Sequence, residues 1–440
     1  MESIAELGQI FNDKRLGRRF LVIKEMIQRR MDSLISNCFP SVALRAGAYR
    51  FFSNDKVTPE KILTTHYPVL KERIVQSTGD VLMIQDSSTL SYPSHPCTKN
   101  LGRVGTNSSP GYGVITHNSL CFDDEQNIPL GLSNQTFFSH TPTEKSYERP
   151  IEEKESYRWI EHLRHNHALC PHAIHICDRE ADIFELLCEA NSLKASFVIR
   201  QSHNRALGQT MHGKREGYLL DHLEKAEIMG TYEEFIQHES VLLFVKAIQI
   251  TIAPPWRTPE QKKQRSYHPL QVTVVQVTGK MLKGDKIDWT LLTSLSVSNI
   301  EEAQRVVRYY TKRWQIELFH KALKTGFSLE EARLEDGINL QKLIALISIE
   351  AVCVYAILYA SRLLEPPPIS TFLDQQEIEA ITFLMREKQS PSLSKIINFI
   401  AVQGGFIKTK KYPHPGLLTF FRGWNRVKPQ IDAVRLVSNR

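Results

Sequence analysis

Two short apolar segments, far apart in the chain, each run directly into an aspartate. Residues 81–85 lead to Asp86, and residues 173–177 lead to Asp178. Apolar runs of this length predict buried strands, and sites in open α/β sheets form where strands end. If the two strands are parallel neighbours, both carboxylates point into one crevice. A lone aspartate after a strand more often caps a turn. With two such strands, the pattern supports a functional site and a pair of turns about equally.

The elements around these segments predict the fold class. Two further strands are predicted at residues 114–122 and 128–138, with a polar turn between them. Helices follow at residues 147–165 and 181–193, and the last strand is predicted at residues 196–200. The first three strands can form an antiparallel meander, and the later crossovers give parallel pairing. This order predicts an α/β fold with a ribonuclease-H-like mixed sheet.

Three domains are predicted, with one insertion. Residues 1–65 form a basic helical domain that suits DNA binding, although a helical cap with solvated charges would look similar. Residues 66–365 form the ribonuclease-H-like catalytic domain, interrupted by a β-rich insertion at about residues 205–288. Strands are predicted there at 241–252 and 271–278, with a basic loop containing Lys262, Lys263 and Arg265 between them. Residues 366–440 begin with a triple-proline linker and predict a helical domain suited to dimerisation.

The composition indicates in which cellular compartment the protein works and which kinds of site it can contain. The net charge of +7 permits a polyanionic partner without requiring one. Seven cysteines without a C-x-x-C pair disfavour zinc ribbons and disulfides, and favour reduced thiols in the cytoplasm. No signal-peptide pattern opens the chain. The longest apolar run, residues 343–360, contains Glu350 and is interpreted as a buried core helix rather than a membrane span.

A third carboxylate lies in a predicted helix at residues 305–326. At 100° per residue, five polar side chains of this helix fall within about 80° of arc. They are Tyr310, Arg313, Glu317, Lys321 and Lys324. Arginine, lysine and tyrosine are suited to binding phosphate, so this stripe places one carboxylate among phosphate-binding groups. The alternative is a solvated amphipathic face with a Glu317–Lys321 pair.

Three carboxylates without a histidine or cysteine cluster favour hard cations. Asp86, Asp178 and Glu317 offer only oxygen ligands, which favour Mg²⁺ or Mn²⁺ over zinc. Two such ions about 4 Å apart can activate an attacking oxygen and stabilise a leaving oxygen in phosphoryl transfer.

These residues resemble the signatures of a known family. Tyr310, Arg313, Glu317 and Lys324 have the spacing of the Y-R-E-K signature of bacterial insertion-sequence DDE transposases, the hairpin-forming cut-and-paste group. Residues 178–183, D-R-E-A-D-I, resemble the second-aspartate motif of that family, and Asp86 with S-S-T-L-S-Y resembles the first. Weaker similarity at residues 16–17, 47–51, 404–406 and 423–424 extends the resemblance over nearly the whole chain.

The resemblance implies a role for each of these residues. Asp86, Asp178 and Glu317 would bind two Mg²⁺ ions, with Mn²⁺ able to substitute, and Tyr310, Arg313, Lys321 and Lys324 would hold a phosphate. Trp289 would stack on a flipped base, unless it is a core residue of the sheet. Arg200 would lie near DNA, unless it only ends a surface strand. The N-terminal DNA contacts would include Arg18, Arg19 and Arg50.

The implied activity is cut-and-paste transposition on double-stranded DNA by a homodimer, in the cytoplasm and without a membrane. Water would free a 3′-OH at the element end, the 3′-OH would form a hairpin, and a second hydrolysis would reopen it before strand transfer. Two rivals remain. One is a plain metal-dependent nuclease, and the other is a DNA-binding relative without catalysis.

Overall fold

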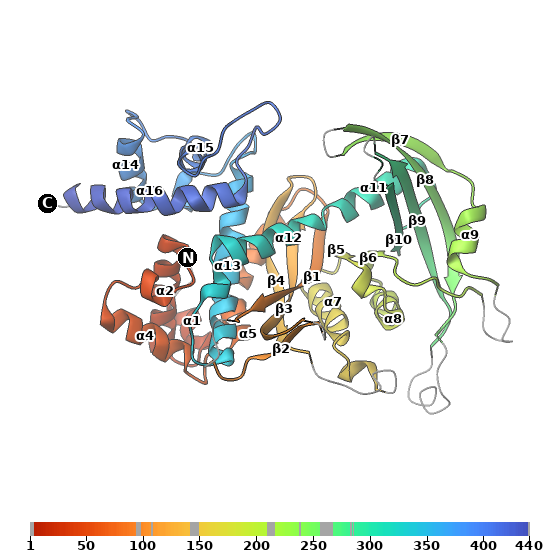
Figure 1. Ribbon diagram of the computed structural model, residues 1–440, viewed down its shortest axis with the longest axis horizontal. Helices are drawn as coiled ribbons and strands as arrows, with labels where there is room; N and C mark the ends of the chain where they lie inside the picture. The colour runs from red at the N-terminus through yellow and green to blue at the C-terminus, as the bar shows by residue number, and fades with distance from the viewer. Residues whose placement is uncertain are drawn as a thin grey trace.

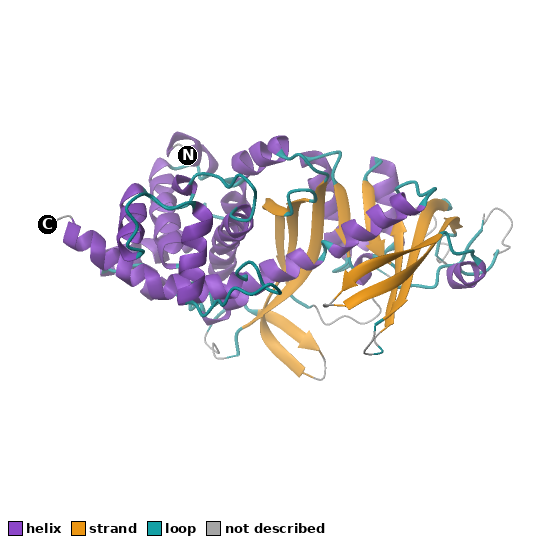
Figure 2. Cartoon of the chain, turned by 90° about the horizontal axis from the view of Figure 1, so that it is seen from above, coloured by secondary structure: helices purple, strands orange, loops and turns teal. Residues whose placement is uncertain are grey.

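The chain folds into an elongated molecule with its helices gathered at one end and a twisted sheet extending to the other (Figures 1 and 2). The computed structural model describes residues 4–93, 98–106, 109–140, 149–208, 216–236, 239–255, 267–281, 284 and 286–438. Both termini lie at the helical end. The basic loop predicted around Lys262, Lys263 and Arg265 lies outside the described residues.

The N-terminal end is helical, as the sequence predicts. Its helices are α1 (Ile4–Ile10), α2 (Lys14–Arg30), α3 (Ile35–Cys38), α4 (Val42–Phe52), α5 (Pro59–Thr64) and α6 (Tyr67–Gln76). Asp13, Ser41 and Thr58 cap α2, α4 and α5 by accepting backbone N–H bonds in the first turn. This helical unit is tied to the rest of the chain at the C-terminal end of α4, where the buried Lys342 ammonium donates to the carbonyl of Phe52.

The predicted antiparallel meander is present and is longer than expected. It consists of β1 (Val81–Ser91), β3 (Ser109–Asp123) and β4 (Ile128–Phe138), with the short β2 (Gly102–Thr106) on the edge of β3. The prediction that the first strand ends at Asp86 is wrong. Residues beyond Asp86 keep pairing with β3 as far as Ser91, because β3 itself starts at Ser109 and supplies partners for them.

The parallel part of the sheet follows the meander as predicted. β1 pairs in parallel with β5 (Ile174–Cys177), and β5 pairs in parallel with β6 (Ser196–Arg200). The crossover helices are α7 (Tyr157–Leu169) and α8 (Phe184–Leu193), with short 3-10 turns at Ile151–Glu153 and Arg179–Ala181. The predicted helix at 147–165 therefore starts ten residues later than expected. Pro150 precedes the turn there, and proline disfavours a helical conformation in the residue before it.

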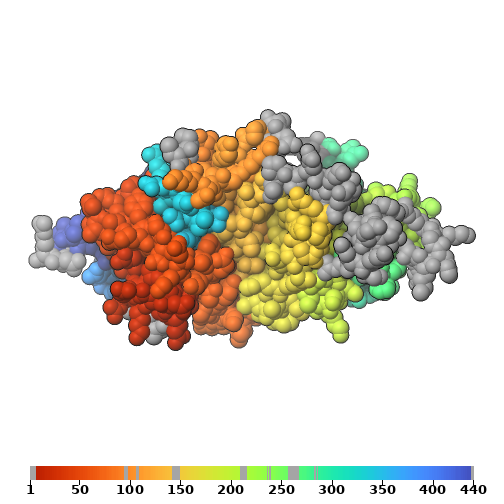
Figure 3. All heavy atoms as spheres, turned by 90° about the horizontal axis from the view of Figure 1, so that it is seen from below, coloured from red at the N-terminus to blue at the C-terminus, as the bar shows by residue number. Residues whose placement is uncertain are grey.

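The insertion extends the same sheet instead of forming a separate one. It contains α9 (Leu219–Lys225), β7 (Gly230–Ile236), β8 (Glu239–Ile252), β9 (Leu270–Lys280) and β10 (Lys286–Thr293). β10 pairs antiparallel with β6, so the strand order is β2-β3-β1-β5-β6-β10-β9-β8-β7, with β4 beside β3. Figure 3 shows the red and orange N-terminal part at one end of the molecule, the yellow α7–α8 part in the middle and the green insertion at the other end.

The helix predicted at residues 305–326 is interrupted. It consists of α11 (Ile300–Thr311), α12 (Trp314–Lys321) and a π-helical turn at Ala322–Gly326. At the break the backbone tightens, since Arg313 N donates to Tyr310 O at 3.0 Å and Ile316 N donates to Arg313 O at 3.2 Å, each three residues back. The uniform 100° spacing predicted for the polar stripe therefore does not hold beyond Tyr310.

The long apolar run forms α13 (Gly337–Ala360), which packs against β4 and the N-terminal helices. This helix is long and apolar enough to span a membrane, but 83% of its most apolar window is buried inside the protein. Such burial is what a core helix shows, and Glu350 within it is also buried.

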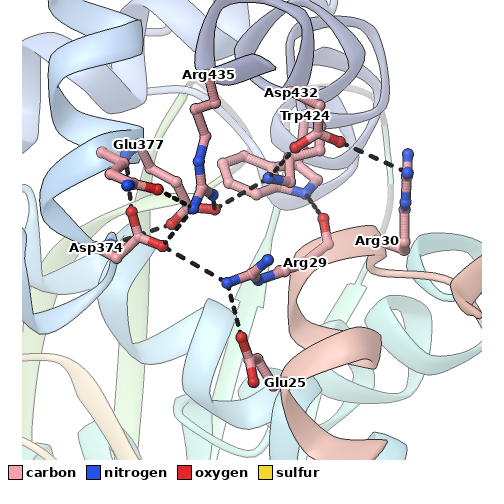
Figure 4. A network of polar contacts seen from close by, with 10 residues as sticks. Glu25, Arg29, Arg30, Asp374, Glu377, Trp424, Asp432 and Arg435 are labelled. Atoms are coloured by element: carbon pink, nitrogen blue, oxygen red, sulfur yellow. Dashed lines mark hydrogen bonds and ion pairs between the residues drawn. The ribbon is translucent and has the colours of Figure 1, made fainter. Parts of the chain in front are cut away.

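The C-terminal helices pack against the N-terminal ones through a network of ion pairs (Figure 4). The helices are α14 (Gln375–Leu384), α15 (Leu393–Gln403) and α16 (Leu417–Ser438), of which α16 was not predicted. Lys428 is buried and bonds to Glu377 at 3.0 Å, and the Trp424 indole donates to the carbonyl of Arg29 in α2 at 3.2 Å. Arg29 also approaches Asp374 at 3.7 Å, so the two ends of the chain form one body.

Buried histidines make the folded chain sensitive to acid. Burial lowers the pKa of His66, His162, His175 and His320 to about 3. An unfolded histidine titrates near 6.5, so below that pH the unfolded chain binds protons that the folded chain excludes. Stability is therefore lost as the pH falls from about 6.5 towards 3.

We expect the free energy of unfolding to fall by about 1 kcal/mol per buried histidine between about pH 7.5 and 5.5. Thermal melting across this range measures the effect. His175→Asn should reduce the pH dependence, because His175 is one of these buried histidines. A melting temperature that stays constant over the range would rule out this contribution.

Candidate active site

The two strand-associated aspartates lie side by side in the sheet. Ile84 of β1 is in register with Ile176 of β5, and Asp86 and Asp178 each lie two residues further along. Both side chains are half-buried. Burial, and next the negative charge of Asp178, raise the pKa of Asp86 to about 7. The pair therefore concentrates negative charge that a cation would relieve.

Arg313 connects the first aspartate to Glu317. Its Nη1 lies 3.3 Å from the Asp86 Oδ2, and its Nη2 donates to the Glu317 Oε1. Glu317 lies in the first turn of α12, and α12 contacts β1. The break between α11 and α12 puts Arg313 at the start of α12, where its side chain reaches Asp86 on β1.

Arg313 bridges the carboxylates of Asp86 and Glu317. The three carboxylates themselves do not form one close group. In the described part of the chain, no three acidic, histidine or cysteine side chains lie close enough to share one metal ion. The donor set nevertheless fits a hard divalent cation. It consists of carboxylate oxygens, and burial, followed by the charge of Asp178, raises the pKa of Asp86. Arg313 supplies the positive charge between Asp86 and Glu317 in this structure.

Three of the other predicted residues adjoin this cluster. The Tyr310 ring lies 5.5 Å from the Trp289 ring, edge to face at 71°. The Arg200 guanidinium donates to the Asp288 carbonyl at 3.4 Å and lies close enough to Tyr310 to oppose the effect of burial on the Tyr310 pKa. Burial raises the pKa of Tyr310, so its hydroxyl stays protonated and can donate to an anion.

The two lysines of the predicted stripe lie further along the helix. Lys321 is exposed, and Lys324 is half-buried in the π-helical turn. Lys324 is close enough to His320 to lower its pKa, after the larger effect of burial. Among the five residues of the predicted stripe, Arg313 bonds to Asp86, and its other nitrogen bonds to Glu317.

The N-terminal arginines lie apart from the carboxylates, in the helical unit. Arg18 and Arg50 are exposed, on α2 and α4. Arg19 is half-buried and donates to the carbonyl of Gly47 at 3.3 Å, so it also joins α2 to α4.

A buried polar network fixes the helix of Glu317 to the sheet. Asn118 pairs with Asp86 across β1 and β3, and its amide is 3.0 Å from the His320 Nε2 on α12. The Asn118 carbonyl oxygen accepts from the Gln135 amide at 2.7 Å. Asp86 and Glu317 are therefore held on two elements that share a hydrogen-bonded partner in the core.

The acidic residues of the segment 178–183 have different environments. Asp182 is fully buried and accepts from the backbone N–H of Ser202 at 2.7 Å and of His203 at 2.9 Å. Its carboxylate also pairs with Arg205. Asp182 thus anchors the chain that leaves β6 for the insertion, while Asp178 faces Asp86.

A large cavity beside the cluster contains a residue to which no role was assigned from the sequence. The cavity has a volume of about 1500 Å³ and lies between α11 and the strands of the insertion. Trp289 and Trp314 both line it, together with Arg305 and Arg308. Trp314 is 58% exposed, which is unusual for tryptophan. In the sequence, the only indication of a role for Trp314 is its position next to Arg313.

Comparison with known families gives one match over the region that contains Asp178 and Glu317 and another over the N-terminal helices. Residues 136–352 match the family described as transposase DDE domain, and residues 5–57 match the family described as transposase DNA-binding. The first match includes Asp178, Trp289, Arg313 and Glu317, whereas Asp86 lies before it. A ribonuclease-H-like fold and the use of divalent metal ions are general properties of DDE domains. The presence of both regions in one chain supports a DDE transposase that carries its own DNA-binding domain.

Proposed function

We propose that this transposase moves its element by cut-and-paste transposition through a DNA hairpin, using Asp86, Asp178 and Glu317 as ligands of two Mg²⁺ ions. The reaction takes place in the cytoplasm on double-stranded DNA, with two protomers pairing two element ends. Mn²⁺ is expected to substitute for Mg²⁺, because both prefer oxygen ligands.

The single observation that carries this proposal is the position of Arg313 between Asp86 and Glu317. A guanidinium is the side chain best suited to bind a phosphate with two parallel hydrogen bonds. Asp86 and Glu317 would be balanced by the cations they hold, and Arg313 would then be free to bind a phosphate of the element end. Tyr310 and Arg200 extend this phosphate-binding surface, and Lys321 and Lys324 continue it along the DNA.

Bound divalent cations supply an activated attacking oxygen and a stabilised leaving oxygen. The protein's own residues orient the DNA. Arg313 and Tyr310 hold the phosphate in line, and Arg18, Arg19 and Arg50 contact the element end through the N-terminal domain. Every strand cleavage and joining step is an in-line phosphoryl transfer, so one set of carboxylates serves all of them.

Purified protein, Mg²⁺ and duplexes carrying the element ends test this proposal. Nicking, hairpin formation and joining to target DNA are all expected. Cleavage without hairpin or joining would favour a nuclease instead. Binding without cleavage would favour a non-catalytic DNA-binding protein.

The cavity lined by Trp289 and Trp314 supports the hairpin step. A hairpin requires the DNA to bend sharply at the cut, and a base that leaves the stack needs a place of its own. Two tryptophans at a cavity of about 1500 Å³ offer flat apolar faces for such a base. Arg305 and Arg308 at the same cavity can contact the neighbouring phosphates.

For Trp289→Ala we expect nicking to persist while hairpin formation falls about 10- to 100-fold, since stacking contributes about 1–3 kcal/mol per base. Denaturing gels of end-labelled duplex separate nicked from hairpin product. Phe383→Ala is the control, because Phe383 is an exposed aromatic residue on α14 that does not line this cavity. An unchanged hairpin yield would remove Trp289 from the site.

A further inference from the structure

Arg158, near the start of α7, makes three polar contacts beside the two aspartates. Its Nε donates to the Ser87 Oγ at 3.2 Å, and its Nη2 donates to the Glu180 Oε2 at 2.8 Å. Its Nη1 donates to the Glu155 carbonyl at 2.7 Å. The Arg158 side chain is only 13% exposed, so the protein covers most of it.

The two side chains bound by Arg158 belong to the segments that carry the aspartates. Ser87 follows Asp86 directly on β1, and Glu180 lies two residues after Asp178. One rigid guanidinium thus spans from the first aspartate strand to the second aspartate loop. We propose that Arg158 is a positioning residue that sets the separation of Asp86 and Asp178 for metal binding, an inference that rests on the proposed function of these aspartates.

The surroundings of Arg158 keep its guanidinium in a fixed orientation. The Phe138 ring of β4 lies 4.7 Å from the guanidinium carbon, which gives one face an aromatic partner. Ser87, which accepts from Arg158, is also hydrogen-bonded to the Nδ1 of His117 at 2.9 Å. His117 is fully buried and packs edge to face on Trp159, with ring centroids 4.4 Å apart. Arg158 is therefore joined to the rigid core of the sheet on one side and to the loop of Asp178 on the other.

The charge of Arg158 and its hydrogen bonds have opposite effects on metal affinity. A positive charge near Asp86 and Asp178 repels a divalent cation, so charge alone predicts tighter metal binding when Arg158 is neutralised. Positioning predicts the reverse, because loss of an outer contact lets the ligands move and typically lowers affinity 10- to 100-fold. The direction of the change therefore distinguishes a positioning residue from a nearby charge.

The test uses the full chain, with Mn²⁺ as the probe and no DNA. Calorimetric titration with Mn²⁺ is carried out on the wild type, Arg158→Gln, Arg158→Lys and the control Arg164→Gln. Arg164 lies on the same helix and pairs with Glu189 at 2.7 and 3.0 Å, away from both aspartates. We expect about tenfold weaker Mn²⁺ binding for Arg158→Gln, a smaller loss for Arg158→Lys and none for Arg164→Gln.

Metal-dependent cleavage gives the second measurement. The Mg²⁺ concentration for half-maximal cleavage should rise about tenfold in Arg158→Gln, while end binding in metal-free buffer equals that of Arg164→Gln. Glu180→Ala removes the other partner at a side chain that is 63% exposed, so it leaves the fold intact even if Arg158→Gln does not. Glu180→Gln loses the charge but can still accept the bond, so it is the matched control. Glu180→Ala should weaken Mn²⁺ binding several-fold more than Glu180→Gln does.

Mn²⁺ binding by Arg158→Gln and Glu180→Ala that is equal to or tighter than the wild type would overturn this inference. A failure of the proposed function looks different. In that case the wild type would not bind Mn²⁺, or its Mn²⁺ binding would be unchanged by Glu317→Gln.

Discussion

Glu317→Gln is expected to abolish DNA strand cleavage while leaving binding of the element ends intact. Glutamine has the same shape as glutamate but lacks the negative charge that a divalent cation requires. A metal ion contributes several kcal/mol to the transition state of phosphoryl transfer, and a loss of about 4 kcal/mol slows the reaction about 10³-fold. Cleavage of labelled end duplex in Mg²⁺ measures this loss.

The structure explains why the fold should tolerate this change. The Glu317 carboxylate accepts from Arg313, and an amide oxygen can accept the same bond. Arg313 also keeps its ion pair with Asp86, so it is not left without a partner. Ile316 and Phe319 of α12 stay buried, and they hold the helix against the sheet whatever the charge of Glu317.

End binding is the control for this prediction. The N-terminal domain that contains Arg18 and Arg50 does not include the carboxylate cluster, so a gel-shift assay in metal-free buffer should show wild-type affinity. Glu331→Gln, at an exposed site beyond the same helix, should cleave like the wild type. If binding and cleavage fall together in Glu317→Gln, Glu317 holds the structure instead of serving the reaction.

The sheet could be predicted from the sequence because its strands are short, apolar and set between polar turns. The bounds of β4 and β6 agree with prediction, and the parallel pairing of β1 and β5 follows from the crossover helix between them. The strand boundary at Asp86 was missed because pairing beyond it depends on β3, whose polar and glycine-containing start gives no apolar signal. Local pattern cannot report a partner that lies elsewhere in the chain.

The candidate site could be predicted only in part, for two physical reasons. The ideal helical spacing that grouped Glu317 with four polar residues ignores the tight turn at Arg313 and the π-turn at Lys324. The tight turn at Arg313 also places this side chain between Asp86 and Glu317. A helical wheel drawn from the sequence cannot show this arrangement. Arg158 had no sequence signal at all, because one arginine on a helix looks the same whether it is solvated or buried against two strands.

Asp182→Asn is expected to lower the melting temperature by about 10 °C, through an effect on the fold and not on the chemistry. Asp182 is fully buried and pairs with Arg205, which is itself only 9% exposed. Removing one partner of a buried ion pair costs about 3–5 kcal/mol because the other charge stays buried and uncompensated. Each kcal/mol corresponds to about 2–4 °C in a domain of this size class. Differential scanning calorimetry measures the shift.

A second substitution separates the ion pair from the backbone contacts of Asp182. Adding Arg205→Met to Asp182→Asn removes the uncompensated charge, so the double variant should recover part of the lost melting temperature. The recovery should be incomplete, because Asp182 also accepts from the N–H groups of Ser202 and His203. A double variant that melts below Asp182→Asn would contradict the buried-charge explanation.

Asp178→Asn should give the opposite result although it lies only four residues away. The charge of Asp178 raises the pKa of Asp86, so removing it relieves repulsion and should leave the melting temperature near that of the wild type. Cleavage should nevertheless be lost, because a proposed metal ligand is gone. One segment, D-R-E-A-D-I, would then contain an aspartate that serves the reaction and an aspartate that anchors the insertion to β6. If Asp178→Asn and Asp182→Asn lower the melting temperature equally, then burial does not separate the aspartate that serves the reaction from the one that anchors the insertion.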